Sequence, residues 1–358
     1  MAKVNDDLAI VVGIQTDRDT TNDAVKDATA GVATDDQSAA QSVLFDEDSL
    51  SLSFERSEST EPVVSGSFTK RAGYLQRIQP AFSFTTNAMG GARDATPTEA
   101  GDWNLSTAQT LLYAGAGFST ETEADPTTAY TLAGGLKYLT FKVWRGDHSW
   151  TFPGCFLDPT WNFTPGEKAT ITWTVLCDDI VFNSNDTFPT SLAYDGSGSA
   201  GGQQTAAPPV LKGAEAEIAG LTRGFQSGTL SLSNQSESYP DSNAANGVVF
   251  EQTGREIRFQ GDWYADSTQT DATGDPDATT ADFYNLESDV TSSTSLSFTL
   301  GTAVADDGSG RPTALSFSIP NYRYTAQSRV DSAGKVVWGL DGYATSTTAN
   351  TEMTITAK

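Results

Sequence analysis

The sequence predicts a mainly β protein with two tandem domains, each containing one short α-helix. Short segments in which apolar residues alternate with Thr, Ser or charged residues recur along the 358 residues, and this period of two is typical of strands with one buried face. Turn-forming residues separate the segments, which favours antiparallel hairpins. A similar order of features occurs again about 180 residues later, so the length divides into two domains of ordinary size.

The predicted strands share this alternation and lie between turns that contain Gly, Asp or Pro. The strands are residues 50–54, 75–84, 139–144, 170–175, 230–232, 257–259, 296–300 and 315–319. The turns are residues 145–147, 165–167, 306–310 and 333–335. Because Gly, Asp and Pro adopt turn conformations readily, we expect hairpins and meanders between these strands.

Two segments have helical spacing, one in each half of the chain. The first covers residues 104–117 and the second covers about residues 280–290. Candidate N-caps are Asn104 or Ser106 for the first helix and Thr279 or Thr280 for the second. The expected core-facing residues are Ala108, Leu111, Leu112, Gly115, Phe283, Leu286 and Val290. Gly115 and Gly117 can end the first helix, because glycine is favoured just after a helical C-terminus.

Matches between the two halves indicate an internal duplication. The matched pairs are residues 49–59 with 229–238, 73–79 with 254–260, 149–153 with 316–320, and 166–173 with 334–338. Between the halves, residues 195–204 have the Gly/Ser-rich composition of a flexible linker. The predicted organisation is an N-terminal strand and extended arm at 1–43, a first β domain at 44–182, a linker at 183–209 and a second β domain at 210–358.

The charge balance disfavours nucleic-acid and anionic-membrane binding. The chain has 46 acidic and 21 basic residues and a formal net charge of −25, whereas such binding needs basic surfaces. The single histidine, His148, leaves few general-base or imidazole–metal schemes, so we do not expect an enzyme. The sequence begins without a signal peptide and contains no run of about 18 apolar residues, which predicts a protein made in a cytoplasm and not embedded in a membrane.

Two patterns resemble functional motifs, but each fits a structural role better. Gly196, Gly198 and Gly201 match the spacing of a dinucleotide fingerprint, which needs a preceding strand and a following helix that are missing here. Residues 145–147 spell the adhesion tripeptide Arg-Gly-Asp. We interpret them as a hairpin turn, with His148 as a polar residue of the hairpin.

Two clusters of carboxylates have the residue types of metal or catalytic sites. One acidic loop contains Asp266, Asp271, Asp275 and Asp277. It lacks the closing glutamate of an EF-hand, so a solvated loop is favoured over a calcium site. A second cluster contains Glu55, Glu58 and Glu61, but nothing in the sequence fixes two of these carboxylates across a cleft as in a glycosidase. The sequence therefore predicts no catalytic, cofactor-binding or metal-binding residue.

The two cysteines and the tryptophans are expected to be structural. Cys155 and Cys177 lie on neighbouring predicted strands. A reduced, packed pair is favoured because cytoplasmic proteins rarely form disulfides, and a bridge is the alternative. Core or subunit-contact positions are expected for Trp144, Trp150, Trp161, Trp173, Trp263 and Trp338.

The first half has a recognisable order: an opening strand at 9–16, a helix ending in Leu-Leu-Tyr-Ala-Gly-Ala-Gly-Phe within 110–118, and a hairpin, a Pro-Gly turn and a long strand within 138–182. This order resembles the major tail tube proteins of long-tailed phages and tailed archaeal viruses, over roughly residues 5–182 and 208–358. In the second half, residues 296–358, and especially 311–321, match how these proteins commonly finish. Many of these proteins carry one such domain, whereas this chain carries two, and its second predicted helix lacks the Leu-Leu and Gly-x-Gly-Phe pattern.

The resemblance implies two tandem β-sandwich or split-barrel domains in a structural protein of the virion tail. Its copies would stack as rings into a tube through which genomic DNA passes without specific binding, with tape-measure and tail-completion proteins as further partners. If one domain normally fills one of six ring positions, three copies of this chain complete a ring. A surface-exposed adhesin or S-layer-like module is the alternative, and an enzyme with acidic catalytic residues is a third hypothesis. The excess of Asp over Lys predicts a halophilic host.

Overall fold

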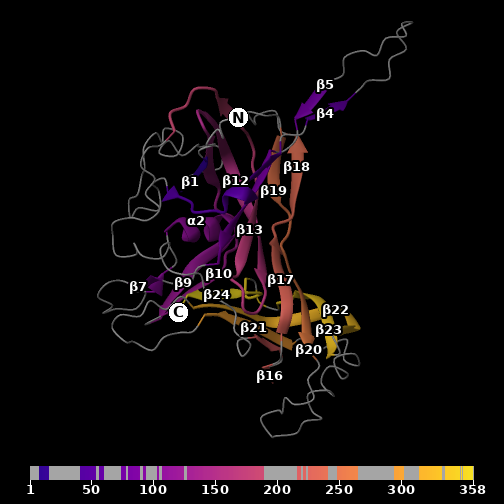
Figure 1. Ribbon diagram of the computed structural model, residues 1–358. Coiled ribbons are helices and arrows are strands. Elements are labelled where there is room, and N and C mark those ends of the chain that lie inside the picture. The colour runs from indigo at the N-terminus through magenta and orange to yellow at the C-terminus, as the bar shows by residue number, and fades with distance from the viewer. Residues whose placement is uncertain are drawn as a thin grey trace, which may run out of the picture.

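The described part of the chain is almost entirely antiparallel β-structure (Figure 1). The computed structural model describes residues 8–15, 41–53, 56–59, 74–77, 80–88, 92–93, 103–104, 107–124, 127–188, 216–218, 221–222, 225–240, 248–264, 294–301, 314–332, 335–346, 348 and 350–357. The second predicted helix, most of the predicted arm and linker, the glycine motif and the acidic loop lie outside these residues. Within them, no helix is long and apolar enough to cross a membrane.

The elements fall into two sets that follow one another along the chain. The first set is β1 (Leu8–Ile14), β2 (Gln41–Ser42), the 3-10 helix η1 (Glu47–Ser49), β3 (Ser51–Ser53), β4 (Arg56–Ser59), β5 (Tyr74–Arg77), β6 (Ala81–Asn87), β7 (Ala92–Arg93), β8 (Trp103–Asn104), α2 (Thr107–Gly115), β9 (Phe118–Ala124), β10 (Thr127–Leu132), β11 (Leu139–Arg145), β12 (His148–Phe163), β13 (Thr170–Leu176) and β14 (Val181–Asn183). The second set is β15 (Ala216–Ile218), β16 (Leu221–Thr222), β17 (Phe225–Ser233), β18 (Ser236–Pro240), β19 (Val248–Gln252), β20 (Glu256–Tyr264), β21 (Thr294–Leu300), β22 (Leu315–Ser332), β23 (Lys335–Ala344) and β24 (Thr354–Ala357).

The two sets pair their strands in the same order. In the first, β2-β1-β11-β12-β14 form one row and β3-β6-β13-β12 form another. In the second, the rows are β16-β15-β21-β22-β24 and β17-β20-β23-β22. The long strands β12 and β22 each belong to both rows of their half. Each half also has a separate two-stranded hairpin, β4–β5 or β18–β19, between the first two strands of its second row.

Two strand pairings join the halves. β12 pairs with β17, with Thr160 opposite Ser231, which makes a single eight-stranded row from β3 to β22. β10 pairs with β24, with Tyr130 opposite Ile355, so the C-terminal strand lies beside a strand of the first half (Figure 1). The halves are therefore connected by backbone hydrogen bonds at two places.

The hydrophobic core continues across the junction between the halves. The ring of Trp161 lies 5.7 Å from that of Phe317, and the ring of Phe163 lies 5.2 Å from that of Phe298. Four predicted core tryptophans are fully buried: Trp144, Trp161, Trp173 and Trp263. Burying such large side chains is the main favourable contribution to folding, so the aromatic contacts stabilise the junction together with the two strand pairings.

The predicted alternation is confirmed in most strands but not in β11. Exposed or half-exposed residues alternate with buried ones along β6, β13 and β20. In β11, however, six successive residues are buried, because both faces of this strand are covered. The predicted strand at 75–84 is also wrong in its extent, since it divides into β5 and β6.

The first predicted helix is confirmed as α2. Its expected core-facing residues are all buried: Ala108, Leu111, Leu112 and Gly115. A Cβ atom on Gly115 would overlap the side chains of Leu157 and Leu139, so the helix packs closer to β11 and β12 than another residue would allow. Gly117, with φ +93°, ends the helix in the left-handed conformation that favours glycine.

The favoured state of the cysteines is corrected by the structure. Cys155 and Cys177 form a disulfide between β12 and the end of β13. The register of these antiparallel strands, with Phe156 opposite Leu176, places the two cysteines directly opposite each other, and their Cα atoms are 4.0 Å apart. This proximity, which the sequence spacing alone did not fix, brings the two sulfur atoms together.

Candidate functional site

One face of the eight-stranded row is covered mainly by hydroxyl and amide side chains, and we call it the hydroxyl face. Because successive residues of a strand point to opposite sides, the strand register places these side chains in lines across the sheet. One line consists of Thr85, Thr172, Thr160, Ser231, Arg258 and Tyr343. The next consists of Asn87, Thr170, Asn162, Thr229, Gln260 and Asp341. The opposite face of the same strands is the buried core.

In the second half, the hydroxyl face also carries charged residues: Glu256, Arg258, Asp262, Arg323 and Asp341. Arg258 donates hydrogen bonds from Nε and Nη2 to the two oxygens of Asp341, at 2.8 and 2.5 Å. Gln260 also donates to Asp341, at 3.1 Å. The guanidinium holds the pKa of Asp341 below its ordinary value, so the pair stays ionised and its charges cancel. Among the described residues of this face, the first half contributes one carboxylate, that of Asp158.

The face has a shallow, open depression of about 470 Å³ near the junction between the halves. It lies over β12, β17, β20 and β23, and Asn162, Thr229 and Asp341 are among its lining residues. Gly339 leaves this space open, because a Cβ atom there would lie 2.6 Å from Oγ of Ser328. The lining offers hydroxyl and amide groups, the ion-paired Asp341 and a second carboxylate, that of Asp262.

A buried asparagine holds the second half to the first. Asn234 donates from Nδ2 to the carbonyl oxygens of Leu157 and Ala116, at 2.9 and 3.2 Å. Its backbone N–H donates to Oδ1 of Asp158 at 2.8 Å. Burial raises the pKa of Asp158 to about 6, and the hydrogen bonds from Asn234 and Ser233 only partly oppose this effect.

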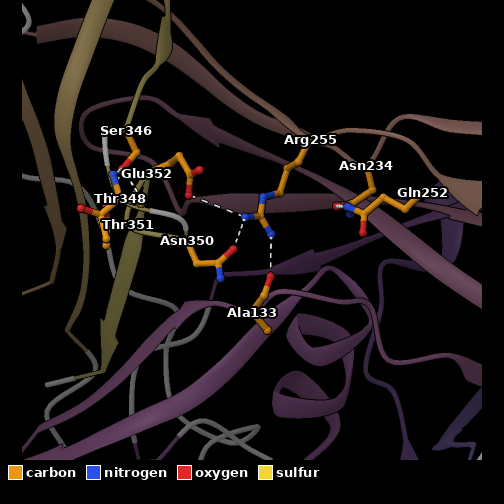
Figure 2. Close-up of polar contacts among 9 residues, drawn as sticks. All are labelled: Ala133, Asn234, Gln252, Arg255, Ser346, Thr348, Asn350, Thr351 and Glu352. Atoms are coloured by element: carbon orange, nitrogen blue, oxygen red, sulfur yellow. Dashed lines mark hydrogen bonds and ion pairs between the residues drawn. The ribbon is translucent and has the colours of Figure 1, made fainter.

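A second polar cluster at the junction centres on Arg255 (Figure 2). The guanidinium donates to the carbonyl oxygen of Ala133 at 3.1 Å and to Oδ1 of Asn350 at 3.0 Å, and it lies 3.6 Å from a carboxylate oxygen of Glu352. Ala133 follows β10, whereas Asn350 and Glu352 precede β24. Arg255 therefore fixes the place where a strand of the first half joins the sheet of the second.

The eight-stranded row has strand edges at both ends. Within the described residues, β3 pairs with β6 on one side, and residues 326–332 of β22 pair with β23 on one side. Edge strands present backbone N–H and C=O groups that can pair with another strand. β3 corresponds to β17, and β22 corresponds to β12. The two ends of the row therefore match the two strands that pair with each other in its middle.

The sequence motifs do not assemble into a catalytic or metal site in the part of the chain that the structure describes. Residues 145–147 form the tight turn between β11 and β12. His148, which follows the turn, is half-exposed, and its Nε2 lies 3.6 Å from Oδ1 of Asp147. Glu58 lies in β4, whereas Glu55 and Glu61 lie outside the described residues. The described segments contain no group of three or more potential metal ligands.

One buried charge pair was not foreseen from the sequence. Nζ of Lys142 lies 2.8 Å from Oδ2 of Asp186 and 4.7 Å from the ring centre of Trp144. Ser149 donates to the same carboxylate oxygen at 2.5 Å. The pair ties the segment after β14 to the β11–β12 hairpin. A lysine inside an alternating strand pattern predicts an exposed side chain, so only the three-dimensional position of Asp186 explains its burial.

Comparison with known proteins adds no relative: no protein-family model matches the chain, and no curated protein sequence matches it significantly.

Proposed function

We propose that this chain is a structural virion protein that forms the stacked rings of a viral tail tube. The observation that carries the proposal is the eight-stranded row, in which a four-stranded unit occurs twice. Its two end strands, β3 and β22, correspond to β17 and β12, which pair with each other in the middle of the row. A sheet with this arrangement can be extended by further copies of itself, and closure into a ring removes the edges.

The pairing of β12 with β17 supplies the pattern for contacts between copies. β12 is the last strand of the first unit, and β17 is the first strand of the second. The corresponding contact between chains joins β22 of one copy to β3 of the next. This contact is head-to-tail, so it generates a closed ring when the rotation between units allows closure. Three chains would supply six units.

The hydroxyl face supports a role as the inner wall of the tube. A wall of Thr, Ser and Asn side chains offers weak hydrogen bonds to water, and its Arg258 is already engaged by Asp341. Retention of DNA depends on cationic contacts with phosphates. On the described part of this wall two arginines, Arg258 and Arg323, are outnumbered by the carboxylates of Asp158, Glu256, Asp262 and Asp341. Such a wall suits a conduit through which a genome slides.

Electron microscopy of the purified full-length protein tests this function. We expect rings or stacked tubes with a central channel at protein concentrations in the micromolar range or above. The salt concentration should be varied from about 0.1 M to several molar, because salt screens the repulsion between acidic copies. Protein that remains monomeric over this whole range would contradict the proposal. Monomers that bind cell surfaces through the exposed turn at 145–147 would instead support the adhesin alternative.

A further inference from the structure

The outer edge of the first half exposes two adjacent apolar residues on a short strand. Val181 and Phe182 of β14 are 48% and 54% exposed. Both belong to the small set of large apolar residues that are exposed in the described part of the chain, which also includes Leu44 and Tyr239. The ring of Phe182 lies 5.7 Å from the rings of His148 and Trp150. An exposed aromatic strand of this kind is typical of a protein contact surface.

The equivalent strand of the second half is covered. β14 pairs with the N-terminal part of β12, and β24 pairs with the N-terminal part of β22 in the same way. On its other edge β24 pairs with β10, and Ile355 and Ala357 of β24 are fully buried. Among the described residues, β14 pairs only with β12. β10 therefore covers the outer edge of β24, whereas no strand among the described residues covers the outer edge of β14.

We infer that β14 is a second contact between copies, in which the second half of a neighbouring chain adds a strand to the outer edge of β14. This inference rests on the proposed function. Within one chain, the first half reaches the second half through two contacts, β12–β17 and β10–β24. Repeating both contacts around a ring requires the second half of one chain to reach β3 and β14 of the next.

The occupant is a second copy of this chain because the molecule already contains the same contact once. Adding a strand satisfies the backbone groups of the edge, and the added strand covers Phe182 as β10 covers the equivalent edge of the second half. Buried aromatic residues of this type contribute most of the energy of many interfaces. The pairing of β22 with β3 forms the inner contact, whereas β14 forms the outer contact of the same junction.

The test compares assembly of full-length wild-type protein with two single variants. Phe182→Ser removes the aromatic ring from β14, whereas Leu44→Ser is the matched control, since Leu44 is similarly exposed and follows β2 at the opposite end of the row β2-β1-β11-β12-β14. We expect Phe182→Ser to raise the protein concentration needed for assembly at least about tenfold, as for loss of one interface hot spot. Leu44→Ser should change it less than about twofold. Equal melting temperatures of the monomeric proteins would show that both variants fold.

Hydrogen exchange gives a second readout that does not depend on a substitution. The amides of residues 181–183 should exchange more slowly in assembled wild-type protein than in monomers, because the added strand binds the edge of β14. If wild-type protein assembles but exchange at 181–183 is unchanged, or Phe182→Ser assembles like wild type, the inference is wrong while the proposed function stands. Wild-type protein that never assembles overturns both.

Discussion

Asn234 and Asp158 show how a few buried polar groups can determine the position of one half against the other. The Asn234 side chain donates to two carbonyl groups of the first half, and its backbone N–H binds the carboxylate of Asp158. Gln252 in turn donates to Oδ1 of Asn234 at 2.9 Å. A buried amide whose hydrogen bonds are satisfied in one arrangement leaves them unsatisfied in any other, so this residue favours a single orientation of the halves.

The raised pKa of Asp158 leads to a prediction about stability and pH. The folded protein binds the proton more tightly than the unfolded chain, because the pKa is about 6 in the fold against 3.8 ordinarily. The carboxyl therefore stabilises the fold fully below pH 4, and this contribution is lost as the pH rises through 6. Asp158→Asn should increase the free energy of unfolding at pH 7 by about 1 to 3 kcal/mol relative to wild type.

Thermal unfolding between pH 4 and 8 measures this effect. The difference between Asp158→Asn and wild type should shrink toward pH 4, where the wild-type carboxyl is protonated in the fold and begins to be protonated in the unfolded chain as well. Asp147→Asn, at an exposed carboxylate of the β11–β12 turn, is the control and should give a small difference at every pH. A constant difference for Asp158→Asn across the range would contradict the assigned cause.

At the scale of elements, the sequence predicted strands that alternate and the apolar run of β1, and it missed β9 and most of β12. β6, β13 and β20 have one buried face, so their apolar residues mark them directly. β9 carries the run Thr120 to Glu123, which has no apolar residue, and is a strand because β10 pairs with it. The full length of β12 was also missed. Its 16 residues include Pro153 and Gly154, which ordinarily interrupt strands.

The candidate surface could be predicted only in part, for a related reason. The Thr-rich alternation at 170–175 indicates a polar face, but which strands continue that face depends on the pairing of β12 with β17, a contact between segments that are distant in sequence. Arg255, Asn234 and Lys142 act through partners that are more than 40 residues away along the chain. No local pattern identifies such partners, because they are set by tertiary packing.

The disulfide between β12 and β13 gives a prediction at the same scale. It closes a loop between residues 22 positions apart, and restricting the unfolded chain over a loop of this length is expected to contribute about 3 kcal/mol. A Cys155→Ala/Cys177→Ala variant should therefore unfold at a lower denaturant concentration than the oxidised wild type. A reducing agent should lower wild-type stability and leave the variant unchanged. Detection of two free thiols per chain in unfolded, non-reduced protein would contradict the bridge.

For the whole molecule, the duplicated order predicts the symmetry of the assembly. Two four-stranded units per chain should give rings of three chains, with junctions within chains alternating with junctions between chains. Image analysis at a resolution that separates the two halves should show three-fold order with pseudo-six-fold appearance. Six full-length chains in one ring would defeat this prediction, even if tubes are observed.

The net charge of −25 predicts how stability depends on salt. Repulsion among the carboxylates destabilises the compact state, and added salt screens it. The melting temperature should therefore rise by several degrees between about 0.1 M and several molar salt. The measurement is thermal unfolding of the monomeric full-length protein in NaCl and KCl. A flat or falling melting temperature would argue against adaptation to a halophilic host.

The covalent connection between the two four-stranded units has a consequence for the rate at which rings form. In the proposed ring, every second junction is already present before chains meet, since β12–β17 and β10–β24 are made within one chain. Ring nucleation then requires encounters among three molecules, where a single-unit subunit would require six. Its rate should fall much less steeply on dilution, because the tethered units experience a high effective concentration of each other. A chain with two fused units can therefore start tubes at a lower protein concentration. The contact surfaces of the two units can also differ in sequence, because each unit always contacts the same kind of neighbouring unit.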